Sequence, residues 1–197
     1  MSPAYSGAIV KHMPELSDVE LVENYLKGDK AALEQLIQRY FKQVFLFAKS
    51  YVKQDVLAED VTQEVFVKVW QNLKKFDPEK KFKTWLFQIT KNSCIDLLRK
   101  NKSILSAGQI DEQFMEDSLG KIADDRPLPQ DLLDSKGFEE KLDQIIAALP
   151  LLYAQTVRLH LQHDLTFQEI ADVLAEPINT IKSRYRRALI SIRDNLK

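Results

Sequence analysis

The chain has 197 residues, 45% of them hydrophobic and 29% charged, a composition typical of a globular protein with one large or two small domains. Its single cysteine, Cys94, excludes an internal disulfide, and its formal net charge of −1 leaves room for separate acidic and basic segments. No apolar run approaches the length of a membrane span and no signal peptide opens the chain, so we expect a protein of the reducing cytoplasm.

Two amphipathic helices are expected before residue 53, and residues 1–16, which lack periodicity, are expected to form a loose arm. A capping box formed by Ser17 and Glu20 predicts the start of a short helix, which Gly28 ends. Three of its apolar residues should face inward: Leu21, Tyr25 and Leu26. The second helix, from Ala31 to about Val52, has apolar residues at helical spacing along its length.

A third helix, from about Val56 to Leu73, is predicted to have one apolar and one acidic face. The apolar stripe consists of Val61, Val65, Val69 and Leu73, with Phe66 and Trp70 beside it. The acidic face consists of Glu59, Asp60, Gln63 and Glu64. Such a face is either simply solvated or a docking surface for a basic partner, and the pattern leaves both interpretations open.

A fourth helix is expected from about Phe82 to Lys100, after a break at Phe76-Asp77-Pro78. Aromatic and basic residues alternate around its start: Phe76, Lys80, Lys81, Phe82, Lys83, Trp85, Phe87 and Lys91. Aromatic rings stack on unpaired bases while lysines follow the backbone, so the mixture suits single-stranded nucleic acid. The alternative is that Trp85 and its apolar neighbours belong to the core.

Residues 103–135 are predicted to be an acidic linker between two helical domains. Eight acidic residues lie between Asp111 and Asp134 against Lys121 and Arg126, and the segment has no sustained apolar period. The first domain is expected to span 17–102 and the second 136–197. The fold class that follows is all-α, with a helix-turn-helix in the second domain.

The helix-turn-helix is predicted between Leu165 and Ile192. Thr166 and Glu169 form a capping box for its first helix, and Pro177 marks the turn. Asn179 or Thr180 is expected to cap the second helix, whose inward residues are Ile181, Tyr185, Ala188, Leu189 and Ile192.

The outward face of that second helix combines short polar and long basic side chains. It is expected to carry Asn179, Lys182, Ser183 and Arg186, with Arg184 and Arg187 on its flanks. This is the mixture that contact with bases and phosphates in the major groove requires. The alternative is a solvated basic helix.

Enzymatic functions are disfavoured because the sequence has no glycine-rich phosphate loop, no nucleophile elbow and no cluster of cysteine and histidine. His160 and His163 lack a third ligand, so we expect no metal and no cofactor, and we interpret the pair as solvated or as lying at a helix end. Two other functions remain as rivals: a one-component regulator that binds duplex DNA, and an enzyme acting on nucleic acid.

The chain resembles an extracytoplasmic-function (ECF) sigma factor of bacterial RNA polymerase from about Leu21 to Leu196. The resemblance is carried, in this order, by AEDVTQEVFVKVW, FDPEKKFKTWLFQITKNSCIDLLRK and LTFQEIADVLAEPINTIKSRYRRAL, with an acidic linker before the last. It implies a non-enzymatic protein that directs polymerase to promoters and helps melt them. In that family the first domain binds the polymerase clamp and the −10 element, and the second binds the −35 element.

The resemblance also implies roles for individual residues. The clamp-binding helix of the family matches Asp60, Gln63, Glu64 and Phe66. Binding of the −10 element is expected at Asp77, Lys80, Lys81, Lys83, Trp85 and Asn92, and binding of the −35 element at Asn179, Lys182, Ser183, Arg184, Arg186 and Arg187. The implied partners are the clamp and flap regions of core polymerase, promoter DNA and an anti-sigma factor, with no small-molecule substrate.

Two departures from the family's pattern occur in the turn of the second motif. Ala175-Glu176 stands where the family often has a glycine first, and Asn179 stands where it often has another glycine. Both substitutions keep the turn at Pro177, so they bear on promoter preference rather than on the fold.

Overall fold

The computed structural model describes residues 16–104 and 138–196, and every element in this part of the chain is helical. The helices are α1 (Asp18–Leu26), α2 (Lys30–Val52), α3 (Asp55–Asn72), the 3₁₀ turn η1 (Leu73–Lys75), α4 (Phe82–Ile104), α5 (Phe138–Ala148), α6 (Leu151–Leu161), α7 (Phe167–Leu174) and α8 (Ile178–Leu196). Most of the expected arm and nearly all of the expected acidic linker lie outside the described residues.

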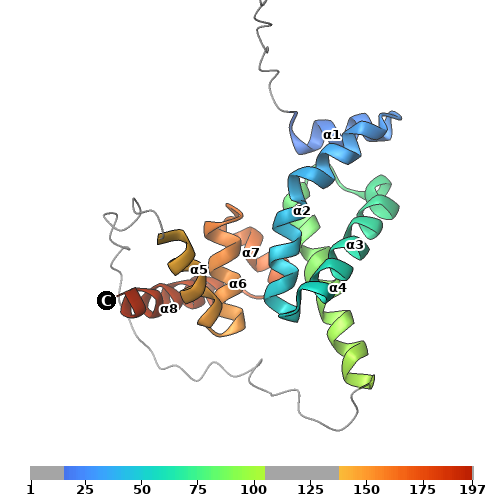
Figure 1. The fold of residues 1–197 in the computed structure, drawn as a ribbon. Coiled ribbons are helices and arrows are strands. Elements are labelled where there is room, and N and C mark those ends of the chain that lie inside the picture. The colour runs from blue at the N-terminus through green and yellow to red at the C-terminus, as the bar shows by residue number, and fades with distance from the viewer. Residues whose placement is uncertain (1–15, 105–137, 197) are drawn as a thin grey trace, which may run out of the picture.

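Helices α1 to α4 form the first unit, at the right of Figure 1, where α3 packs on both α2 and α4. The predicted capping box is present at the start of α1, with the Ser17 hydroxyl accepting from the Glu20 amide and the Glu20 side chain accepting from the Ser17 amide. The Arg39 guanidinium donates to the Asp18 carboxylate over 2.6 Å, which holds α1 against α2. Phe47, in the middle of α2, is fully buried and meets the ring of Phe87 edge-on.

Helices α5 to α8 form the second unit, in which α6 and α7 both pack on α8. The second predicted capping box is also present, with Thr166 and Glu169 exchanging hydrogen bonds at the start of α7. The turn after α7 bends through Ala175, whose φ of 57° is left-handed, and Pro177 follows. This places α7 and α8 as a helix-turn-helix.

The two units share one hydrophobic core. Helix α7 lies against α4, and α6 lies against α2 (Figure 1). Buried residues of α7, such as Ile170 and Val173, belong to the same apolar cluster as Phe47 and Phe87 of the first unit. A second, smaller cluster around Ile146 and Ile192 joins α5, α6 and α8. The core therefore continues across the domain boundary that the sequence suggested.

Three expectations about these helices are wrong. Leu26 is 48% exposed because it lies in the last turn of the short α1, beyond the cover of α2. Helix α4 continues past Lys100 to Ile104, into the residues expected to begin the linker. Helix α8 begins at Ile178, and the Ile181 amide already donates to the Pro177 carbonyl, so neither Asn179 nor Thr180 is its N-cap.

We predict that Phe47→Ala lowers the free energy of unfolding by about 3–5 kcal/mol, because the buried ring leaves a cavity beneath Phe87. Phe41→Ala, on the same helix, is the matched control. Phe41 is 46% exposed and stacks on Phe66, so its removal should cost roughly 1 kcal/mol or less. Urea unfolding of both variants measures the difference, and equal losses would contradict the assignment of Phe47 to the core.

Candidate nucleic-acid and polymerase interfaces

Helix α8 turns a polar and basic face outward. Asn179, Lys182 and Arg186 are exposed, and Ser183 and Arg187 are partly exposed. The opposite face is held by the buried Ile181, Ala188 and Ile192. Tyr185 lies beside this apolar face, with its ring 4.8 Å from His160 and 5.2 Å from Phe167. The apolar residues thus fix which side chains α8 presents to solvent.

Arg184 is not on the flank of that outward face, which corrects the expectation from the sequence. Its side chain is 5% exposed, and its two terminal nitrogens donate to the two carboxylate oxygens of Glu176 over 3.2 and 2.9 Å. The turn at Pro177 folds Glu176 back over α8, which the helical spacing of the sequence could not reveal. Arg184 is therefore committed to a side chain of its own domain.

A pocket of about 280 Å³ lies between α3 and α4 and is lined by Lys68, Asn72, Lys75, Trp85, Ile89 and Asn92. It brings together two of the residues expected to bind the −10 element, Trp85 and Asn92. Trp85 is only partly buried and rests on the rings of Phe76 and Phe82, so it belongs both to the core and to the pocket wall. The pocket thus combines an aromatic ring with amide and ammonium groups.

The α3 side of this pocket was missed by the sequence reasoning. The Lys68 ammonium donates to the Ser93 hydroxyl and lies 2.7 Å from the Glu64 carboxylate, and the Asn72 amide donates to the Lys68 carbonyl. Lys68, Asn72 and Lys75 recur at intervals of four and three residues, which places them on one side of the helix and the turn that follows it. In the sequence, this spacing was the signal that the three side chains share one surface.

The other residues expected to bind the −10 element do not line the pocket. Asp77 and Lys80 are exposed in the turn before α4. Lys81 forms an ion pair with Glu169 of α7 over 2.7 Å, and Lys83 donates to the His163 carbonyl over 2.6 Å. The structure therefore separates the set into residues at the pocket, residues in the turn and residues that hold the second unit.

Within the described residues, Lys83 is one of three α4 side chains that donate hydrogen bonds to main-chain carbonyls of the second unit. The Lys91 ammonium donates to the Leu174 carbonyl over 2.6 Å, and the Gln88 amide donates to the Asp172 carbonyl over 3.1 Å. Burial lowers the pKa of Lys91 from its ordinary value, and the nearby Glu176 carboxylate opposes that shift. The Asp172 and Leu174 carbonyls lie in the last turn of α7, where helices leave acceptors unpaired, and the His163 carbonyl lies two residues beyond the end of α6.

The acidic face of α3 is open to solvent. Glu59, Asp60, Gln63 and Glu64 are exposed, while Val61, Val65 and Val69 are buried on the other side. Phe66, which was predicted to lie beside the apolar stripe, is 8% exposed, and its ring stacks on Phe41 with the centroids 6.2 Å apart. An apolar ring at this position turns toward α2, so Phe66 supports the surface from beneath rather than forming it.

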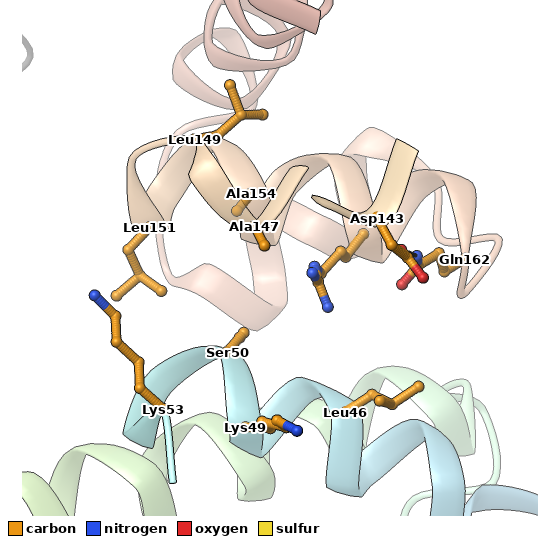
Figure 2. Close-up of a pocket in the computed structure, with 11 residues that line it drawn as sticks. Leu46, Lys49, Ser50, Lys53, Asp143, Ala147, Leu149, Leu151, Ala154 and Gln162 are labelled. Carbon is orange, nitrogen blue, oxygen red and sulfur yellow. Dashed lines mark hydrogen bonds between the residues drawn. The ribbon is translucent and has the colours of Figure 1, made fainter. Parts of the chain in front are cut away.

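A groove of about 480 Å³ runs between α2 and the α5–α6 hairpin (Figure 2). Leu46, Lys49 and Lys53 line its α2 side, and Leu149 and Leu151 line the opposite side. Within the described residues, the buried Nε of Arg158 in this groove has no hydrogen-bond partner. The groove therefore combines leucine and alanine side chains with the basic Lys49, Lys53 and Arg158 and the acidic Asp143.

Two family models match the chain. Sigma-70 region 2 matches residues 36–104, and the second type of sigma-70 region 4 model matches residues 139–192. Together they cover more than half of the chain, in the order and on the two units just described. Curated relatives that match over most of the chain are ECF sigma factors, and the chain belongs to this family. It is therefore a non-enzymatic transcription initiation factor that confers promoter recognition on RNA polymerase.

Curated relatives of this sigma factor match along nearly their whole length. The ECF RNA polymerase sigma factor SigW of Bacillus subtilis is 29% identical over 89% of this chain and 95% of its own. The ECF RNA polymerase sigma-E factor of Escherichia coli is 29% identical over 88% of this chain and 91% of its own. The region 2 match runs from Leu36 in α2 to the end of α4, and the region 4 match runs from the start of α5 to Ile192 in α8.

Solved structures share the fold. CnrH, in its complex with the cytosolic domain of CnrY, superposes with a TM-score of 0.60 at 21% identity and covers 91% of this chain and 96% of CnrH. RpoE of Bartonella quintana, in its complex with the anti-sigma factor NepR, superposes with a TM-score of 0.57 at 23% identity and covers 83% and 95%. No described helix of this sigma factor is both long and apolar enough to span a membrane.

His163 makes the contact between the two units sensitive to pH. Its ring is 3% exposed and packs on Phe87 with the centroids 4.6 Å apart, so it is not the solvated histidine that the sequence allowed. Burial, followed by the positive charges of Lys83 and Arg158, lowers the pKa of His163 to about 4, and Asp164 opposes the shift. Its Nδ1 has no hydrogen-bond partner among the described residues, so a protonated ring finds no acceptor there.

We predict that acid weakens this packing. The pKa of His163 in the folded chain lies below its unfolded value of about 6.5, so the unfolded chain binds the proton more tightly. The contribution of His163 to stability is complete above pH 6.5 and falls as the pH drops toward 4, by up to roughly 3 kcal/mol. Urea unfolding between pH 7.5 and 5 should show the decline, and His163→Gln should flatten it. An identical slope in the variant would contradict this.

Proposed function

We propose that this sigma factor captures a base of the melted −10 element in the pocket between α3 and α4. The observation that carries the proposal is the lining of that pocket. Trp85 supplies a stacking surface, Asn72 and Asn92 supply amide donors and acceptors, and Lys75 supplies positive charge for the backbone, while Glu64 offsets the charge of Lys68. Unstacking a base costs a few kcal/mol, which a fitted pocket offsets. Asp77 and Lys80, in the adjoining turn, are proposed to contact the flanking strand.

The −35 element is proposed to bind the outward face of α8. Lys182, Ser183 and Arg186 share that face with Asn179, so they are assigned to base edges, and Arg187 at its side is assigned to phosphate. Arg184 is left out of the contact surface because its guanidinium is buried against Glu176. This support is geometric: the polar face of α8 is exposed while its apolar face is packed.

The acidic face of α3 is proposed to dock on the clamp of core polymerase, and the second unit on the flap. Asp60, Gln63 and Glu64 offer carboxylates and an amide to a basic partner. Phe66 is proposed to act indirectly, by supporting Phe41, whose half-exposed ring stacks on it.

Simultaneous binding of both promoter elements requires the two units to separate. The −10 and −35 elements lie roughly 25 base pairs apart, which is about 85 Å at about 3.4 Å per base pair. Helix α4, with 23 residues, and α8, with 19, are only about 35 and 28 Å long at about 1.5 Å per residue. Because α4 packs on α7 and α7 packs on α8, the pocket and α8 lie too close together to reach the two promoter elements at the same time. Polymerase is therefore proposed to bind an extended form.

An anti-sigma factor is proposed to hold this sigma factor in the packed form. The groove of Figure 2 supports this because it lies between the two units and combines apolar residues with charged ones, most of them basic. A segment that fills it would contact α2 and the α5–α6 hairpin at once and oppose their separation. CnrY and NepR are partners of the two structural relatives, and the proposal extends that kind of partner to this chain.

Transcription with purified core polymerase tests the function as a whole. Promoter fragments selected by the holoenzyme would be transcribed from duplex templates and from templates with a preformed bubble over the −10 element. Specific initiation should depend on this chain in both cases. Binding of promoter duplex without any effect on core polymerase would instead support a one-component regulator.

We predict that reversing two charges on α3, Asp60→Lys and Glu64→Lys, weakens binding to core polymerase at least tenfold at moderate salt, because the docking surface then repels its basic partner. Asp96→Lys, at an exposed site on α4, is the matched control for charge. Affinity measured with labelled sigma factor, together with helicity by circular dichroism, checks the prediction. Unchanged affinity in a folded variant would remove α3 from the docking surface.

We predict different effects for two arginines of α8. Arg186→Ala should cost about 1–3 kcal/mol of −35 binding and relax discrimination at one or two base pairs. Arg187→Ala should weaken binding to all sequences alike and reduce the salt dependence by about one counterion. Affinities for a panel of −35 variants at two salt concentrations separate the two effects. The reverse outcome would exchange the assignments of the two side chains.

A further inference from the structure

The ion pair between Arg184 and Glu176 joins α8 to the turn that precedes it. Each terminal nitrogen of Arg184 donates to one carboxylate oxygen of Glu176. The arginine side chain is 5% exposed, and that of Glu176 is 28% exposed. A guanidinium and a carboxylate in this paired geometry have a fixed relative orientation. The pair therefore constrains direction as well as distance.

Glu176 is itself anchored to the end of α7. Its amide donates to the Ala171 carbonyl over 3.0 Å, and the preceding Ala175 is held in the left-handed region. Arg184 lies in the second turn of α8, eight residues further along the chain. The pair thus ties the second turn of α8 to the C-terminal end of α7, across the Pro177 turn.

An interaction at this point controls how α8 is oriented on α7. The inner face of α8 is held by the buried Ile181 and Ala188. Their contacts are apolar and therefore have no preferred direction. Such contacts tolerate a small rotation of the helix, whereas a buried two-point ion pair does not. A small rotation would move Lys182 and Arg186 away from the base edges assigned to them.

We propose that Arg184 and Glu176 form a positioning pair that sets the orientation of α8 for −35 recognition, and that Arg184 does not contact DNA phosphate. The inference rests on the proposed binding of the −35 element by α8. Glu176 thereby becomes a determinant of promoter preference, although a carboxylate has no favourable interaction with the DNA backbone.

Two substitutions distinguish positioning from direct phosphate contact. Glu176→Gln keeps the side chain's shape but releases Arg184, and Arg184→Lys keeps the charge but removes the paired geometry. If the pair positions α8, both variants lose about tenfold in affinity for the preferred −35 duplex and lose preference among base variants, with an unchanged salt slope. If Arg184 contacts phosphate, Glu176→Gln binds as tightly as the parent chain or more tightly, and keeps its base preference.

The experiment uses the full chain, with binding of −35 duplexes measured at two salt concentrations. Asp172→Asn is the matched control, because it removes an exposed carboxylate from α7 without touching Arg184. Circular dichroism at the assay temperature verifies that each variant is folded. Wild-type or higher affinity of Glu176→Gln, with preserved base preference, overturns the proposal.

A charge-swapped chain, Glu176→Arg with Arg184→Glu, covers the case in which a single variant unfolds. Recovery of base preference relative to either single variant supports the pair, and a folded double variant without preference overturns it. A failure of the proposed −35 binding by α8 gives a different result. If α8 does not bind the −35 element, the parent chain itself shows no preference across the panel.

Discussion

The packing of α4 on α7 is the interaction on which the arrangement of this sigma factor depends. Lys83 and Lys91 lie eight residues apart on α4, and they donate to the carbonyls of His163, just after α6, and of Leu174, the last residue of α7. Cations at these positions satisfy unpaired acceptors and oppose the negative end of the helix dipole. Between them, Phe87 packs on His163, so polar capping and apolar burial act at the same contact.

This contact divides α4 between two tasks. Residues Trp85, Ile89 and Asn92 face the pocket shared with α3, whereas Lys83, Phe87 and Lys91 face the second unit. The pocket is therefore not filled by region 4 in the packed form. The packing limits the distance between the pocket and α8. With α8 held this close to a pocket that binds the −10 element, it cannot reach the −35 element.

Much of the fold could be predicted from the sequence because its signals are local. The capping boxes at Ser17 and Thr166 and the valine stripe of α3 depend on residues three or four positions apart. Helical spacing also predicted the acidic face of α3, and the family resemblance then implied which domain binds which promoter element. Sequence spacing also contained the signal for Lys68 and Asn72, although it was not used.

The remaining features depend on contacts between distant residues. Lys83 and Lys91 meet acceptors 80 and 83 residues away, and basic side chains beside aromatic ones are equally typical of DNA contact. Arg184 meets Glu176 only because a turn intervenes, so helical spacing placed the arginine on a surface that it does not reach. The burial of Phe66 follows from its place beside the valine stripe, whereas its stacking on Phe41 of α2 depends on a contact between two helices.

The acceptors for Lys83, Gln88 and Lys91 are main-chain carbonyls, and this has a consequence for how such proteins diverge. No side-chain substitution on α6 or α7 removes a backbone carbonyl, provided that the helix keeps its course. Residues facing DNA on α8 can therefore change while α4 still finds the same partners. An α8 of different sequence preference could therefore replace the present one, and the second unit would keep its contacts with α4 without compensating mutations.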